Sequence, residues 1–276
     1  MFDPKKRNHR ILYAQNFLKN PSTARYLVKI AEIKTQDTVL EVGPGRGVIT
    51  DALLEVSGNL ILIEKDKILV QELNKRYQAH KSVKIINADV LKYNIDIKDY
   101  KVFSNPPFNI SSQIIKKFLF DKYSPSHMYL FLQKEATERF QGKLMENQLS
   151  ILIKTWYEVS VIYKFKRTDF NPAPAVDVYF VKFSRRDGSL VKIENKSEYI
   201  LFVQYGFQQQ KANLMKNFNK LFTYNQWKRL AHDHKFNIKS QPSDLSAHQW
   251  SALFDFYQTG VSEDKKYLLK NYKPQT

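Results

Sequence analysis

The feature that most constrains the fold is a compact apolar run that ends in a glycine-rich turn. Thr38–Val42 is typical of a buried strand, and the segment 43–47 (GPGRG), which we call the glycine turn, follows it directly. A stretch with helical apolar spacing comes next, and a second apolar run, Leu60–Ile63, ends at Glu64. This order of strand, glycine turn, helix, strand and acid is typical of an open α/β sheet that binds a nucleotide at the carboxyl ends of its strands.

The glycine turn and the acid have complementary uses in such a site. Gly43 and Gly45 allow the backbone to approach a ligand closely, and free N–H groups at the start of the next helix can hold an anionic group such as a carboxylate. Glu64 stands about twenty residues further on, where an acid accepts hydrogen bonds from two ribose hydroxyls. Glycines alone are often purely structural, but together with the acid they predict a nucleoside-type ligand.

Two further predicted strands bring polar residues to the same edge of the sheet. Val83–Asn87 is followed by Asp89, and Lys101–Phe103 leads to Asn105. Ligands of open α/β sheets bind outside the carboxyl ends of the strands, so we expect these side chains and the glycine turn to surround one crevice. Asp89 could accept a hydrogen bond from an adenine amino group there; the alternative is an ordinary helix cap or turn residue.

The segment 105–108 (NPPF), which we call the proline turn, is the second constellation that can carry chemistry. Adjacent prolines fix φ, remove two N–H donors and leave their carbonyl groups as acceptors. The amide of Asn105, the carbonyl of Pro106 and the ring of Phe108 then face one space, which suits a flat heterocycle with an exocyclic amine; the alternative is a stiff loop with a buried Phe. A second aromatic-proline loop contains Phe170, which forms either a second wall for the heterocycle or part of a stiffened connection.

The rest of the chain completes the sheet and then changes character. Three more strands bring the predicted total to seven, with the last pair antiparallel, at 128–132, 158–163 and 177–183. We expect an α/β domain over 1–184 that begins with a mobile basic arm at 1–10, and a small all-α domain over 185–276. The predicted helices in this part are one long or broken helix at 135–155, then 196–208, 211–220, 223–235 and 245–258, with a weak basic tail from 262.

The charge of the chain indicates a polyanionic partner. Lys and Arg total 44 against 27 Asp and Glu, and the net charge of +17 exceeds what solubility requires. Nucleic acid is the first candidate and an anionic membrane surface the second. No apolar run approaches the ~18 residues of a membrane span. In the helical domain basic residues are interleaved with aromatic ones, which suits either a phosphate backbone or a solvated basic face.

Metal and thiol chemistry are not expected. The chain contains no cysteine, which excludes disulfides, thiolate metal sites and thiol catalysis and is compatible with a cytoplasmic location. His232 and His234 are two residues apart on a predicted helix, so their side chains diverge and do not form a metal site. We expect a monomer.

The groups at the predicted crevice favour methyl transfer to an amine over hydride transfer. A dehydrogenase needs an acid or base that handles the hydride, whereas this site offers two amine acceptors and stacking rings. The N6 lone pair of adenine is conjugated with its ring; hydrogen bonds to Asn105 and to the Pro106 carbonyl would favour a pyramidal nitrogen that can attack an activated methyl. S-adenosylmethionine fits the expected donor site, and a polymeric substrate would have to present an unstacked adenine.

Six motifs in order resemble the rRNA adenine N6-methyltransferase and dimethyltransferase family, over nearly the whole chain. They are 15–18 (QNFL), 41–47 (EVGPGRG), 63–66 (IEKD), 87–89 (NAD), 105–111 (NPPFNIS) and 170–176 (FNPAPAV). The resemblance implies a Rossmann-like class I methyltransferase sheet and S-adenosylmethionine as cofactor. It implies cofactor contacts at Asn16, Leu18, Gly43, Glu64, Asp89 and Asn105, to which we add the neighbours Gly45, Lys65 and Val90. It also implies a target adenine held by Asn105, Pro106 and Phe108, with Phe170 as a second wall.

Two branches of this family compete. Erm-type enzymes methylate 23S rRNA and confer macrolide-lincosamide-streptogramin resistance, whereas KsgA-type enzymes dimethylate adenines in 16S rRNA. The segments 221–227 (LFTYNQW) and 245–254 (LSAHQWSALF) are similar to the Erm C-terminal domain, so we expect the Erm type. A non-catalytic RNA-binding relative is a further alternative. The chain departs from the family at Pro106, where an aliphatic residue is usual, and at Asp177-Val178, where a polar-Ser pair is usual.

Overall fold

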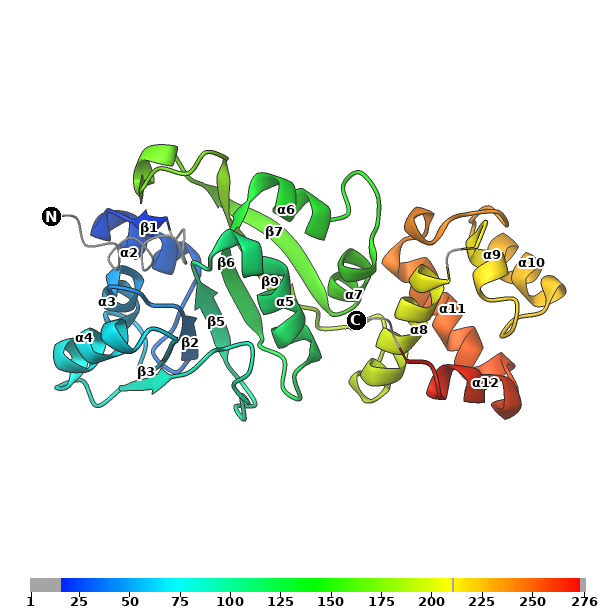
Figure 1. Ribbon diagram of the computed structural model, residues 1–276, viewed down its shortest axis with the longest axis horizontal. Helices are drawn as coiled ribbons and strands as arrows, with labels where there is room; N and C mark the ends of the chain where they lie inside the picture. Colours follow the sequence, from blue (N-terminus) through cyan, green and yellow to red (C-terminus); the bar gives the residue numbers. More distant parts are fainter. Residues whose placement is uncertain (1–15, 210, 274–276) are drawn as a thin grey trace, which may run out of the picture. The chain divides into compact units, whose positions relative to one another are not determined.

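The computed structural model describes residues 16–209 and 211–273 and divides the chain into two compact units (Figure 1). The sheet unit consists of the chain up to residue 137 together with 159–184, and the helical unit of 138–158 together with 185–276. The last crossing between the units follows residue 184, and 138–158 groups with the helices. The predicted arm at 1–10 and the motif residue Gln15 lie outside the described residues.

The sheet has seven strands in the order β4-β3-β2-β5-β6-β9-β7. Strands β2 to β6 pair in parallel, and β9 runs antiparallel to β6, which confirms the predicted seven-stranded sheet with its last strand antiparallel. The strands are β2 (Thr38–Val42), β3 (Asn59–Glu64), β4 (Val83–Asn87), β5 (Lys101–Ser104), β6 (His127–Gln133), β7 (Tyr157–Lys164) and β9 (Val178–Arg185). The order reverses between β2 and β5, and this switch point is where open α/β sheets bind their ligands.

The strand registers bring three chain segments level at the switch point. Val42, the last residue of β2, pairs with Ile63 on one side and with Ser104 on the other. The Ser104 hydroxyl also donates a hydrogen bond to the Val42 carbonyl at 2.8 Å, which ties the ends of β2 and β5 together. The glycine turn, Glu64 and the proline turn therefore leave the sheet at the same edge.

Helices connect the strands of the sheet unit. They are α2 (Pro21–Ile30), α3 (Val48–Leu54), α4 (Lys67–Tyr77), α5 (Ser111–Phe120) and α6 (Lys134–Phe140). Asn20 caps α2 by accepting from the Ser22 amide, and Asp66 caps α4 by accepting from the Ile68 amide, which satisfies N–H groups that have no partner inside the helix. Fully buried leucines of α2 and α3 pack with those of β3 in one apolar core.

A second, two-stranded sheet was not predicted. It pairs β1 (Phe17–Leu18) with β8 (Phe170–Asn171) in antiparallel fashion, and the Lys19 amide donates to the Asp169 carbonyl at 2.9 Å beside it. Strands of two residues are too short to give a periodic pattern, so only the three-dimensional pairing shows them.

The helical unit contains α7 to α12. These are α7 (Gln148–Trp156), α8 (Lys196–Gln208), α9 (Leu214–Asn217), α10 (Tyr224–Asp233), α11 (Ala247–Gly260) and α12 (Glu263–Lys270); the short 3-10 helices of the chain are η1 (Phe108–Ile110), η2 (Arg167–Asp169), η3 (Ile193–Asn195) and η4 (Pro242–Asp244). The helix predicted at 196–208 is confirmed, whereas α9 is shorter than predicted and the supposed tail contains α12. The 135–155 helix is broken near Gly142, whose φ of +61° does not fit a helix. Within the described residues, no helix is long and apolar enough to span a membrane.

Candidate active site

The glycine turn adopts a conformation that requires its glycines. Gly43, Gly45 and Gly47 have φ values of +67°, +59° and +84°, in the left-handed region that other residues rarely occupy. The Gly43 amide donates to the Ile63 carbonyl at 2.9 Å, which carries the parallel ladder one residue past the end of β2. The turn is therefore anchored to the sheet on the side where a ligand is expected.

Glu64 is held against this turn by backbone amides. The residue is 6% exposed, and one carboxylate oxygen accepts from the Gly45 amide at 3.3 Å. The other oxygen accepts from the amides of Lys65 and Asp66 at 2.8 and 2.9 Å. A carboxylate has about four lone-pair positions, so this one retains capacity for a ligand hydroxyl. The structure brings Gly45 and Glu64 together, as the sequence predicts.

Asp89 and Lys65 form an ion pair beside Glu64. The Lys65 Nζ lies 2.9 Å from an Asp89 carboxylate oxygen, and the Leu91 amide donates to the other oxygen at 3.1 Å. The hydrogen bond from Lys65 lowers the pKa of Asp89, so this group is ionised at neutral pH and can only accept hydrogen bonds. Val90, predicted as a cofactor contact, is 7% exposed and faces the interior.

The proline turn presents Asn105 in a defined orientation. The Asn105 side-chain nitrogen donates to the Asn16 carbonyl at 2.8 Å. A carbonyl can only accept, so this bond fixes which end of the amide is which and leaves the Asn105 Oδ1 as the acceptor. Pro106 is buried, and Phe108 is half-buried and packs against the core at the start of η1. The contact with Asn16 also brings two predicted site residues together.

β1 places an unpredicted aromatic residue over the glycine turn. The Phe17 ring is 38% exposed, and a Cβ atom added to Gly45 would stand 3.1 Å from its edge. Leu18, predicted as a cofactor contact, has its side chain in the core at 4% exposure, so only its backbone can face a ligand. Phe17 lies inside the QNFL motif, but its role depends on the β1–β8 pairing, for which the sequence has no local signal.

Phe170 is a core residue in this structure, which differs from the expectation of a second wall. Its side chain has 0% exposure and packs edge-on against Phe165, with ring centroids 4.9 Å apart, and against Phe131 at 6.2 Å. The reason is the strand register: Phe170 pairs with buried Leu18, while exposed Phe17 pairs with exposed Asn171. Paired residues in a ladder share a face, so the pairing that exposes Phe17 turns Phe170 inward.

Glu41 is a second residue that the sequence analysis did not single out. It lies in β2, one residue before the end of the strand, is 2% exposed, and accepts a hydrogen bond from the Thr50 hydroxyl of α3 at 2.7 Å. Burial raises the pKa of Glu41 to about 8, and the carboxylates of Asp51 and Glu64 act in the same direction. The available signal was a charged residue inside the apolar run 38–42.

Replacing Glu41 with glutamine should remove part of the pH dependence of stability. The folded-state pKa near 8 lies above the ordinary value of 4.5, so the stability that the bound proton contributes is complete below the ordinary value and is lost as pH rises through 8. Glutamine cannot ionise and still accepts from Thr50. We expect Glu41→Gln to gain stability relative to the wild type between about pH 5 and pH 9 in urea unfolding. Parallel stability profiles for the two proteins would contradict this.

The described residues include His, Asp and Glu, whose side chains are of the types that can ligate a metal. Across residues 16–209 and 211–273, no three or more His, Asp or Glu side chains are grouped so that they could hold a metal ion. The His232 ring instead lies 3.1 Å from the adjacent Asp233 carboxylate, and both are exposed.

Comparison with known proteins identifies the family. The family model described as ribosomal RNA adenine dimethylase matches residues 6–259. A curated rRNA adenine N-6-methyltransferase from Bacillus anthracis is 25% identical over 261 residues, which cover 94% of this chain and 91% of that protein. A ribosomal RNA small subunit methyltransferase A from Malacoplasma penetrans is 32% identical over 255 residues, which cover 88% of this chain and 90% of that protein.

A solved structure supports the fold. The crystal structure of the 23S rRNA methyltransferase ErmE superposes with a TM-score of 0.75 at 21% identity, and the match covers 88% of this chain and 100% of that chain. This confirms the predicted Rossmann-like methyltransferase fold with a helical part after the sheet. Because the family model spans most of the sequence, the chain belongs to the ribosomal RNA adenine dimethylase family, a family of rRNA adenine N6-methyltransferases.

Proposed function

We propose that the chain uses S-adenosylmethionine to methylate the N6 amine of an adenine in 23S rRNA, as Erm-type enzymes do. The observation that carries the proposal is the strand register, in which β2, β3 and β5 end side by side at the switch point. It places the glycine turn, Glu64 and Asn105 at one edge of the sheet. A nucleoside-type donor site and an amine-acceptor turn are the two halves that this reaction requires.

The donor half fits the functional groups of S-adenosylmethionine. Glu64 has acceptor capacity left for a ribose hydroxyl, and Asp89 is an ionised acceptor suited to an adenine amino group. The positive φ values of Gly43 and Gly45 allow the backbone to contact the ligand directly. When bound, the cofactor supplies an electrophilic methyl group. The residues of this chain hold and orient it.

The acceptor half is the proline turn. The Asn105 Oδ1 and the Pro106 carbonyl accept the two hydrogens of the adenine amine, which directs the nitrogen lone pair away from them. Phe108 offers the face of an aromatic ring to the base. Methyl transfer forms the new N–C bond as the donor C–S bond breaks, and the methylated amine then loses one proton to water. Orientation and fixed dipoles supply most of the acceleration.

We assign RNA binding to the helical unit. Seven basic side chains on and around α9 and α10 are exposed: Lys211, Lys216, Lys220, Lys228, Arg229, Lys235 and Lys239. The aromatic residues interleaved with them, such as Phe218 and Trp227, are buried. The interleaving therefore reflects helices with an aromatic core and a basic surface, and RNA would be held mainly through phosphate contacts.

One observation favours a second candidate function, dimethylation of 16S rRNA. The relative from Malacoplasma penetrans, named for small-subunit rRNA, is more similar in sequence than the Bacillus anthracis one, at 32% against 25% identity. The Erm-like segments 221–227 and 245–254 favour 23S rRNA.

Methyl transfer from labelled S-adenosylmethionine to protein-free 23S rRNA and to small-subunit particles separates these functions. We expect label on an adenine of 23S rRNA and, in a susceptible bacterium that expresses the protein, higher resistance to a macrolide. Label only on 16S rRNA would replace the 23S proposal with the 16S one. No transfer to either RNA, with RNA binding retained, would indicate a non-catalytic relative.

A further inference from the structure

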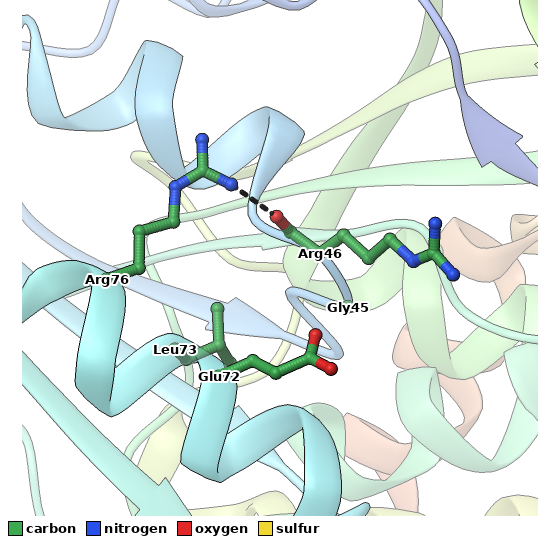
Figure 2. A pocket seen from close by; sticks show the side chains of 5 residues that line it. All are labelled: Gly45, Arg46, Glu72, Leu73 and Arg76. Carbon is green, nitrogen blue, oxygen red and sulfur yellow. Dashed lines mark hydrogen bonds between the residues drawn. The ribbon is translucent and has the colours of Figure 1, made fainter.

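Side chains of α4 contact the backbone of the glycine turn at Arg46 and Gly47. Figure 2 shows Arg76 of α4 extending to the turn, where its guanidinium donates to the Arg46 carbonyl at 2.8 Å. The same guanidinium pairs with the carboxylate of Asp51 in α3. These groups border a cavity of about 300 Å³ that is lined by Gly45, Arg46, Glu72, Leu73 and Arg76. Arg76 thus connects the turn, α3 and α4.

Tyr77, the next residue of α4, completes this arrangement. Its hydroxyl lies 2.7 Å from an Asp51 carboxylate oxygen and 3.2 Å from the Gly47 carbonyl. Burial raises the pKa of Tyr77 above its ordinary value, so the hydroxyl keeps its proton at neutral pH and can donate it to either acceptor. A Cβ on Gly47 would stand 2.3 Å from the Tyr77 oxygen, so the backbone of the turn lies directly against this ring.

The turn needs such support because of its composition. Glycine has more freedom in the unfolded and unbound chain than any other residue, and three of the five turn residues are glycines in the left-handed region. If the turn were mobile, a ligand would lose affinity by having to order it, whereas a turn that is already fixed avoids that cost. The α4 contacts fix the carbonyl side of Arg46 and Gly47, opposite to the sheet contact of Gly43.

We propose that Arg76, Tyr77 and Asp51, which we call the α4 clamp, are positioning residues that preorganise the glycine turn for the cofactor. The inference rests on the proposed use of S-adenosylmethionine. The clamp residues act through the backbone of the turn and are not proposed to touch the cofactor. Their loss should therefore weaken cofactor affinity and leave the rate at saturating cofactor largely unchanged.

If Arg76 and Asp51 only stabilised the fold, their loss would affect cofactor affinity no more than the loss of another exposed ion pair. The chain offers such a pair as a matched control. The side chains of Arg76 and Asp51 are 49% and 41% exposed, and ion pairs this exposed add little to stability. Arg25 and Glu55 form a comparable pair at 2.8 Å, with exposures of 58% and 48%, between α2 and the end of α3. This second pair makes no hydrogen bond to the glycine turn.

The experiment compares Arg76→Gln, Tyr77→Phe and Arg25→Gln in the full chain by calorimetric binding of S-adenosylmethionine, thermal unfolding and steady-state kinetics. We expect Arg76→Gln and Tyr77→Phe to raise the cofactor Kd by about 5- to 20-fold, the loss of one or two hydrogen bonds. KM for the cofactor should rise in parallel while kcat stays within about twofold. Arg76→Lys should recover part of the affinity, because lysine keeps the charge but lacks the planar fork. Arg25→Gln should leave Kd unchanged.

The possible outcomes separate this inference from the proposed function. If the wild type binds S-adenosylmethionine and both clamp variants bind it equally well, the clamp has no positioning role. If Arg25→Gln raises Kd as much as Arg76→Gln does, with a similar fall in Tm, the effect is general destabilisation and the inference is wrong. If the wild type does not bind S-adenosylmethionine, the proposed function fails, and the clamp's role in cofactor binding fails with it.

Discussion

Asn105→Ala is expected to lower kcat for RNA methylation by about a hundred- to a thousandfold, the usual effect of removing one preorganised polar group from the reacting centre. The Asn105 Oδ1 is the side-chain acceptor that the structure directs away from Asn16, and alanine has no group to replace it. Without it the amine lone pair is no longer oriented towards the methyl group. Single-turnover transfer of labelled methyl groups to 23S rRNA measures the effect on the chemical step directly.

Two variants test whether this loss is specific. Asn59→Ala removes another side-chain amide that donates one hydrogen bond, to Thr38 at 2.9 Å. Asn59 begins β3, whereas the site lies at the other end of this strand, where Glu64 stands. It should keep wild-type kcat. Asn105→Asp keeps an oxygen but places a carboxylate against the Asn16 carbonyl, so it should lose both activity and the contact with β1. Retention of more than about a tenth of wild-type kcat by folded Asn105→Ala would refute the assigned role.

The site's framework could be predicted because its residues follow buried strands directly. In β2 and β3 a mostly apolar run is itself the signal for a strand covered on both faces, and such strands place the next residue at the carboxyl edge. Gly43, Glu64 and Asn105 each stand within one residue of such an end. Knowing that the strands are parallel was then sufficient to place them at one edge.

The contacts that complete the site depend on residues far apart in the sequence. Asn16 meets Asn105 across 89 positions, and Phe17 pairs with Asn171 across a two-residue ladder. Neither the amide of Asn105 nor the ring of Phe170 has a local pattern that fixes its direction. The sequence of the loop 170–174 was therefore compatible with either a wall of the site or a stiffened connection. The pairing of β8 with β1 places the Phe170 side chain in the core.

The boundary of the helical unit shows a related limit. The segment 138–158 has the same apolar spacing as any helix that covers a sheet, and α7 buries Ile151, Leu152 and Ile153 completely. The periodicity of the sequence shows that these residues are buried, but it does not show whether they pack in the sheet unit or in the helical unit. The composition of the sequence changes after residue 184, whereas no such change marks residue 138, where the chain first passes between the two units.

Phe108→Ala is expected to lower kcat/KM for RNA by about 10- to 100-fold while changing the cofactor Kd less than about twofold, because stacking of one base on an aromatic ring contributes about 1–3 kcal/mol. In the proposed site the ring belongs to the acceptor half, and in the sequence Phe108 follows Asn105, whereas the glycine turn precedes it. Calorimetric binding of S-adenosylmethionine and steady-state methylation of 23S rRNA, on the same preparation, separate the two effects.

Phe108 also packs against the core, so truncation alone cannot distinguish lost stacking from lost folding. Phe108→Leu keeps most of the apolar volume without a flat ring, and Phe108→Tyr keeps the ring. If the ring stacks on the target adenine, Phe108→Tyr should stay close to the wild type, and Phe108→Leu should resemble Phe108→Ala in kcat/KM while matching the wild type in Tm. If leucine restored activity as well as tyrosine does, the side chain would serve packing alone, and recognition of the base would have to depend on the Asn105 and Pro106 acceptors.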